Sequence, residues 1–251
     1  ILPWTRPEAQ DQFVAEVCTV EGLQAIAGYA QAGCAVAGRT IDLPSTDGQK
    51  RNYGLFDGTS GCYISTPDSA ALDVTGDITF IFYMGPTTWT PAIAQAIYGR
   101  YTTAGNQIAY LVSYNSNGTI RINTSPDGTG ASIVVHDSDV TGFTTPHWIK
   151  IEFDVDNGAG GNTATFSTST NPSTVVPLDV SWTPLSVSTK AGTTSIFNAA
   201  SILEIGSLNV GTGNNFIGKI YRAQVYNGIG GTLVADFNAN LWVSGSTLPA
   251  P

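Results

Sequence analysis

Short stretches that alternate between apolar and polar residues recur along the chain from residue 53 onward. WIKIEFDV at 148–155 and KIYRAQVY at 219–226 show the period of two that is typical of a strand with one wet face. Turn sequences rich in Gly, Asn and Asp separate these runs, and such residues accept the backbone angles of tight turns. The pattern predicts strands at residues 53–58, 62–66, 77–84, 107–114, 119–125, 131–137, 148–155, 163–169, 202–208 and 219–226.

Two of the turns predict hairpins. DNGAGG at 156–161 joins two strand-like runs, and NGIGG at 227–231 precedes a second short apolar run. Many short strands with polar turns are typical of a sandwich or jelly roll, whereas alternating strand and helix patterns are absent. The sequence therefore predicts an all-β jelly-roll sandwich.

The first fifty or so residues differ from the rest. Phe13, Val17 and Val20 recur at helical spacing after Pro7, while later glycines interrupt the pattern, so a short helix or two followed by a loop is predicted. This segment either packs on its own sandwich or anchors the chain to a neighbour. The final residues, SGSTLPAP, read as a linker or disordered end. The predicted divisions are 1–53 for a docking segment, 54–240 for the sandwich and 241–251 for the tail.

Composition narrows the class of protein. Of the 251 residues 42% are hydrophobic, enough for a real core, and only 12% are charged. Such weakly charged polar surfaces suit proteins that work outside a cell or in an assembled particle. The net charge of −9, with ten Lys and Arg and no basic cluster, argues against nucleic-acid binding. No apolar run approaches the roughly 20 residues of a membrane span, and no signal-peptide pattern is recognised.

Three cysteines, Cys18, Cys34 and Cys62, allow at most one disulfide within the chain. A framework held mainly by disulfides is therefore excluded, and buried thiols that act as small apolar side chains are favoured. Whether Cys18 and Cys34 pair stays open.

Three motifs between Phe56 and Phe237 resemble those of concanavalin A-like sandwiches of the laminin-G-like type. They are LFDGTSGCYISTPDSAALDVTGDITFIFYM, then HWIKIEFDVDNGAGG, then FIGKIYRAQVYNG, in the order found in that family. The sequences of these motifs are most similar to those of the laminin-G-like domains of bacteriophage structural proteins. The resemblance implies a jelly roll and a component of a virion, attached to its head or tail.

Some enzymes share this sandwich, notably glycoside hydrolases with an E-x-D-x-x-E-type strand, and no such string occurs here. Glu152 comes nearest, alternating with Asp154 and Asp156 along one strand, although such rows usually serve solubility. His136 and His147 lie in no triad-like context, and neither a C-x-x-C pair nor a Gly-Lys-Ser/Thr loop is present. The chain is therefore predicted not to be an enzyme.

Calcium is the cofactor that the resemblance suggests, held at the rim of the sandwich by carboxylates and carbonyls. The family's F-D-G aspartate corresponds to Asp57, but the late strand carries Tyr221 and Arg222 where related chains often have acidic residues. Asp154 and Asp156 in DVDNG form a second candidate set, and the same string is also good turn chemistry.

Sugar binding requires exposed aromatic rings beside directional hydrogen-bonding groups. The candidates are residues in or beside polar loops: Trp89, Tyr114, Trp182, Asn214 and Asn215. The alternative is that most of these aromatic rings fill the sandwich or an interface.

The leading hypothesis is a non-enzymatic bacteriophage virion protein, a capsid decoration or a tail-associated adhesion module. Its partners would be other virion proteins, copies of itself and a host surface glycan. The alternative is an extracellular carbohydrate-binding module from a larger bacterial surface protein or glycoside hydrolase.

Overall fold

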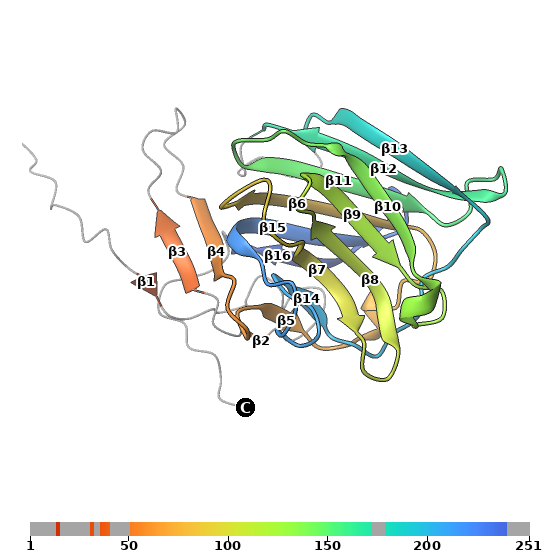
Figure 1. Ribbon diagram of the computed structural model, residues 1–251, viewed down its shortest axis with the longest axis horizontal. Helices are drawn as coiled ribbons and strands as arrows, with labels where there is room; N and C mark the ends of the chain where they lie inside the picture. Colours follow the sequence, from red (N-terminus) through yellow and green to blue (C-terminus); the bar gives the residue numbers. More distant parts are fainter. Residues whose placement is uncertain (1–13, 16–30, 33–35, 41–50, 172–178, 240–251) are drawn as a thin grey trace, which may run out of the picture.

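The computed structural model describes residues 14–15, 31–32, 36–40, 51–171 and 179–239, which form two antiparallel sheets packed face to face (Figure 1). Sheet A runs in the order β1 (Val14–Ala15), β3 (Val36–Thr40), β4 (Arg51–Asp57), β15 (Ile217–Asn227), β6 (Ile78–Pro86), β11 (His147–Asp154), β12 (Gly161–Ser169) and β13 (Thr183–Ala191), with β16 (Thr232–Asn238) also paired to β15. Sheet B runs in the order β10 (Val134–Val140), β9 (Thr119–Thr124), β8 (Gln107–Tyr114), β7 (Gln95–Thr102), β14 (Leu203–Ile205), β5 (Ile64–Thr66) and β2 (Gln31–Ala32). Two single 3₁₀ turns, η1 (Ala70–Leu72) and η2 (Gly130–Ser132), lie in the connections.

The all-β prediction is confirmed. Every predicted strand is present, and both predicted hairpins form, β11–β12 through DNGAGG and β15–β16 through NGIGG. From residue 51 onward, β7 and β13 are the strands that were not predicted, and β1, β2 and β3 lie where a helix and a loop were predicted.

Within the first fifty residues, those that the structure describes are strand rather than helix. Val14–Ala15, inside the predicted helical stretch, pairs with β3, because an extended backbone there completes hydrogen bonds along the edge of sheet A. The rest of the predicted helix, Cys18, Cys34 and the tail at 241–251 lie outside the described residues. Cys62 is buried in the core, as expected for a small apolar side chain.

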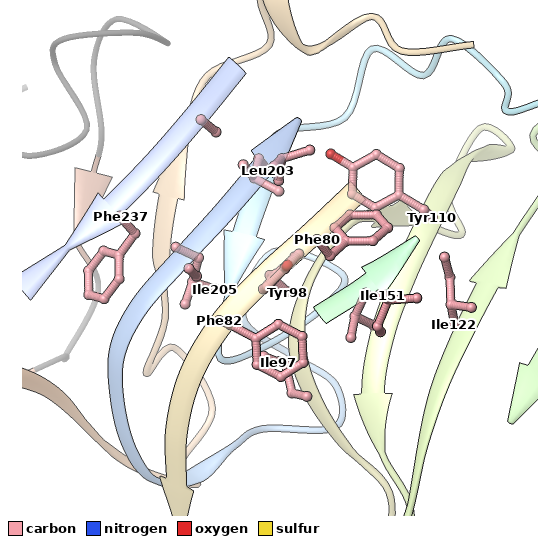
Figure 2. Packing of buried hydrophobic residues seen from close by; sticks show 14 of the residues in the cluster. Phe80, Phe82, Ile97, Tyr98, Tyr110, Ile122, Ile151, Leu203, Ile205 and Phe237 are labelled. Atoms are coloured by element: carbon pink, nitrogen blue, oxygen red, sulfur yellow. The ribbon is translucent and has the colours of Figure 1, made fainter. Parts of the chain in front are cut away.

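The core lies between the two sheets and follows the period-two pattern. In β11 the side chains of Ile149, Ile151 and Phe153 point inward, and the intervening Lys150 and Glu152 stay partly exposed. Figure 2 shows the aromatic centre, where Phe80 and Phe82 of β6 meet Tyr98 and Tyr110 across the sandwich. Ring centroids there are 5.1–5.5 Å apart in tilted or edge-to-face pairs. Each such pair stabilises the fold by about 0.5–1.5 kcal/mol beyond the area that it buries.

The outer face of sheet A carries a second apolar group, the outer aromatic cluster, consisting of Tyr53, Ile81, Tyr83, Trp148, Val180 and Tyr221. The Tyr83 ring is tilted against that of Trp148, with centroids 5.2 Å apart, and lies edge-on to Tyr221 at 5.0 Å. All six residues are buried. This sheet therefore packs apolar side chains on both faces.

Arg100 of β7 is a charged residue inside the core, with 1% of its surface exposed. Its guanidinium donates to the carbonyls of Leu72 (2.6 Å), Ser201 (3.1 Å) and Ala199, and it pairs with Asp68 and Asp73. These bonds fasten η1 and the segment before β14 to β7. No helix in the described part of the chain is long and apolar enough to cross a membrane.

Candidate functional site

Two adjoining hollows lie at the end of the sandwich where β6 finishes and β11 begins. They share Pro86, Thr87, Trp89 and Thr144, and we call the pair the rim site. The first hollow, of about 310 Å³, extends over β4 and β15 to Leu55, Lys219 and Tyr221. The second, of about 420 Å³, extends toward Thr88, Thr90, Gly118, Val140 and Phe143. Volumes of roughly 300–1,000 Å³ accommodate small ligands.

Glycines create the depth of the first hollow. On sheet A, Lys219 lies between Leu55 of β4 and Gly85 of β6 as their cross-strand partner, so Gly85 leaves a gap in this row of side chains. A Cβ atom on Gly85 would lie 2.8 Å from Cγ of Pro146. Gly218 has φ +141, and a Cβ there would lie 2.6 Å from the carbonyl oxygen of Gly85. Side chains at these positions would fill the hollow or push its walls apart.

An aromatic stack supports the floor between the hollows. Trp89 lies edge-on to Tyr114 at 5.2 Å and to Phe143 at 5.0 Å, and Phe143 stacks on His147 at 3.8 Å. Nδ1 of His147 lies 2.7 Å from the carbonyl oxygen of Thr145, which can only accept, so Nδ1 donates the hydrogen. This bond holds the loop before β11 against the strand.

Threonine hydroxyls provide the polar part of the lining. Among the described residues, no group hydrogen-bonds the hydroxyls of Thr87, Thr144 or Thr145, which line the first hollow. In the second hollow Thr88 and Thr90 lie close to each other, with their hydroxyls 3.5 Å apart. None of the described residues that line either hollow is an Asp or a Glu.

The predicted ligand residues are spread over three places. Trp89 lines both hollows, but only 9% of its surface is exposed, so little of its ring is open to a ligand. Tyr114 is fully buried behind it, and burial raises the pKa of its phenol to about 12. Trp182 is partly buried against the outer aromatic cluster, where the ammonium of Lys150 lies 5.5 Å from its ring centroid.

The two predicted asparagines belong to the loop 206–215, which leads from β14 to β15. The backbone carbonyl of Asn214 accepts the N–H of Ala96 at 2.6 Å. The amide of Asn215 accepts from the Ser207 hydroxyl at 2.7 Å and donates to the Gly58 carbonyl at 3.3 Å. These bonds position the loop.

The predicted calcium ligands lie at opposite ends of sheet A. Asp57 is paired to Ile217, near the Pro86 end of β6, whereas Asp154 follows Phe153, which pairs with Ile78 at the other end. Eight residue steps along β6 correspond to about 26 Å, so Asp57 and Asp154 cannot share one ion.

Backbone turns use these carboxylates. Asp57 accepts the N–H and the hydroxyl of Thr59 at 2.9 and 2.7 Å, and the hydroxyl bond is the main reason that its pKa is lowered. Asp154 accepts the N–H of Asp156, which accepts that of Gly158. Over the described residues, no three His, Cys, Asp or Glu side chains gather as a metal site would require.

The sequence reasoning missed the threonines. The signal was present: GPTTWT follows the strand at 77–84, and TGFTTP precedes the strand at 148–155. Because β6 and β11 are antiparallel neighbours, these two threonine-rich loops emerge at the same end of the sheet.

Comparison with known proteins shows the fold. No protein-family model and no curated protein matches the chain. Among solved structures, the full-length tailspike protein 2 of an Escherichia coli O157:H7 bacteriophage matches with a TM-score of 0.51 and 14% identity, over 93% of this chain and 31% of the tailspike. The chain has a two-sheet antiparallel jelly-roll fold, like that of concanavalin A-like domains.

Smaller modules give lower scores. The CBM40 domain of a Ruminococcus gnavus sialidase, solved with α2,3-sialyllactose, matches with a TM-score of 0.47 and 13% identity, over 80% of this chain and 92% of that domain. Domain 4 of an arabinanase from Geobacillus stearothermophilus, solved with arabinotriose, matches with a TM-score of 0.43 and 14% identity, over 80% and 83% of the two chains. These ligands belong to those proteins.

Proposed function

We propose that this jelly roll is a non-catalytic carbohydrate-binding module and that the rim site holds the sugar. The observation that carries the proposal is the lining: Trp89 lines the first hollow together with Thr87, Thr144 and Thr145, whose hydroxyls have no partner among the described residues. Apolar surface with a few convergent polar groups is the usual composition of a small-molecule site. Threonine hydroxyls both donate and accept, as sugar hydroxyls do, so they suit this class of ligand.

The lining also supports binding without cleavage. Glycoside hydrolysis requires two carboxyl groups beside the scissile bond, and no described residue that lines the rim site supplies one. Glu152, the carboxylate that the sequence favoured for such a role, pairs with Lys150 at 2.9 Å on the outer face of sheet A.

The affinity should be modest. Only 9% of the surface of Trp89 is exposed, so stacking on its ring is limited and hydrogen bonds to hydroxyls must contribute much of the binding free energy. We expect dissociation constants between about 1 mM and 1 μM, that is, roughly −4 to −8 kcal/mol.

The test is a glycan array followed by calorimetric titration of the best oligosaccharide. Thr87→Val and Thr144→Val remove one hydroxyl each and keep the shape, so each should weaken binding by about fivefold to tenfold. Thr232→Val, at the exposed first residue of β16, is the matched control and should leave binding unchanged. Equal affinity of all these proteins for the sugar would refute the rim site as the binding place.

A second candidate function is a bacteriophage virion component, a decoration or tail-associated protein with laminin-G-like character. The motifs between residues 56 and 237 and the charged share of only 12% favour it. Light scattering on the full chain separates the two candidates. A trimer or larger ring supports an assembly protein of the virion, and a monomer supports an extracellular binding module.

A further inference from the structure

The charge on Lys219 has no carboxylate partner among the residues that the structure describes. Six basic side chains fall among those that the structure describes, and Arg100, Arg121, Lys150 and Arg222 form ion pairs with carboxylates. No described carboxylate lies within ion-pair distance of the other two, Lys190 and Lys219. In a chain with a net charge of −9, cations without a carboxylate partner are conspicuous.

Tyr53 helps to hold Lys219 in place. The ammonium lies 4.4 Å from the centroid of the Tyr53 ring, a distance at which the ring attracts the cation. Tyr53 is itself fixed, because it is 6% exposed and packs edge-on against Tyr221 at 5.7 Å. The neutral ring steadies the ammonium and leaves its positive charge available.

Lys219 also lines the first hollow, beside the unpartnered hydroxyls of Thr87, Thr144 and Thr145. It is the only charged residue among the described residues of that lining. The overall negative field of the protein repels anions, so an anionic group is favoured only where a local cation outweighs that field. The first hollow meets this condition.

We propose that the first hollow of the rim site selects a sugar that carries a carboxylate, and that Lys219 is the residue that determines this specificity. This inference rests on the proposed function and names its ligand class. A single ammonium matches the single charge of a carboxylate. A phosphate monoester, with a charge of about −1.5 to −2, would need a second cation, and no described residue of the lining other than Lys219 is charged.

The experiment compares ligands that differ only in charge: trigalacturonic acid, a glucuronic acid disaccharide and sialyllactose, each against its neutral methyl ester. With the wild-type protein, we expect at least one acid to bind about tenfold more tightly than its ester at low salt. The preference should shrink in 0.5 M NaCl, because ions screen an exposed pair.

Variants locate the preference. Lys219→Met removes the charge, keeps an unbranched side chain of similar length and should abolish the preference for the acid over its ester. Lys219→Arg should retain the preference. Lys190→Met is the matched control, since Lys190 lines a different hollow with Asn162 and Thr193, and it should change nothing.

Each result decides something. Equal binding of acid and ester to the wild type, or a preference that survives in Lys219→Met, overturns the inference and leaves the proposed function standing. Tighter binding of a sulfated than of a carboxylated sugar overturns the carboxylate assignment. Binding of none of these ligands, together with an empty glycan array, overturns both.

Discussion

The carboxylate of Glu204 accepts the backbone N–H of Gly211 at 2.8 Å, seven residues further along the chain. It also accepts the N–H of Val210 at 2.7 Å. Val210 has φ +58, a left-handed conformation that is costly for a β-branched residue. A fully buried carboxylate therefore holds a strained loop against sheet B.

Replacement of Glu204 by Gln should loosen this loop. An amide nitrogen would face one of the two N–H donors, so the free energy of unfolding should fall by about 1–3 kcal/mol in urea titrations. Burial raises the pKa of Glu204, so its contribution to stability is fully present below the ordinary carboxyl pKa and is lost as pH rises through the raised value. The difference between wild type and variant should therefore narrow as pH rises from 4 upward, and a constant difference would contradict this assignment.

His136 should titrate in the opposite sense. It is buried between the sheets, with Nε2 2.7 Å from the Asn162 amide oxygen, Nδ1 3.0 Å from the Ser188 hydroxyl and its ring against Phe153. Burial lowers its pKa, so its stabilising contribution is present above about pH 6.5 and is lost as pH falls through the lowered value. An NMR titration of the ring protons should give a midpoint below 6.5; a midpoint at or above 6.5 would show that the ring is solvated.

Loss of the Arg100 guanidinium should be among the most damaging single changes. Arg100→Met leaves three carbonyls and the carboxylates of Asp68 and Asp73 without their donor, so the free energy of unfolding should fall by about 3–5 kcal/mol. The comparison is Arg121→Met, which breaks the half-exposed pair with Asp137 and should cost about 1 kcal/mol or less. Guanidinium chloride titrations of both variants check the contrast, which similar losses would refute.

Gly218→Ala tests the close approach beneath the first hollow. The new methyl group would meet backbone atoms of Gly85 and Pro86 at 2.6 Å, and backbone cannot move aside as a flexible side chain does. We expect a loss of at least about 2 kcal/mol in thermal unfolding, together with weaker sugar binding.

Gly230→Ala is the control for the backbone angle. It also has a positive φ, +66, but its Cβ would have nothing within 4 Å. It should cost only the conformational penalty, about 1–2 kcal/mol, and should not affect binding. Equal losses in the two variants would mean that the contact with Gly85 contributes nothing.

Much of the fold was predictable because half-buried strands alternate apolar and polar residues with a period of two. Strand β13 was not predicted from the sequence because it lies at the edge of sheet A, where Thr183, Ser186 and Ser188 need not be apolar. Strand β7 was not predicted because Gly99 interrupts it and two register shifts break its alternation of apolar and polar residues. Neither feature can be read without knowing which strands pair.

The candidate site was less predictable. Trp89 stood out by residue type, but whether a ring is exposed depends on its neighbours, and Tyr114 proved to be core. Thr87 and Thr144 look like ordinary loop residues until β6 and β11 are known to be neighbours. The gap over Gly85 depends on a third strand, β15.

The central position of β15 has a consequence for how the protein is made. Its residues 217–220 pair with β4 and its residues 222–227 with β16, while β6 occupies the other side. Strands β4 and β6 end by residue 86, but the strand that lies between them, β15, begins only at residue 217. The space between β4 and β6 in sheet A therefore stays unfilled until β15 has been synthesised. Sheet A cannot be completed on the ribosome until β15 has emerged, more than 130 residues after the end of β6, and pairing over such sequence distances is slow. Until then, the facing edges of β4 and β6 stay open to pairing with other chains.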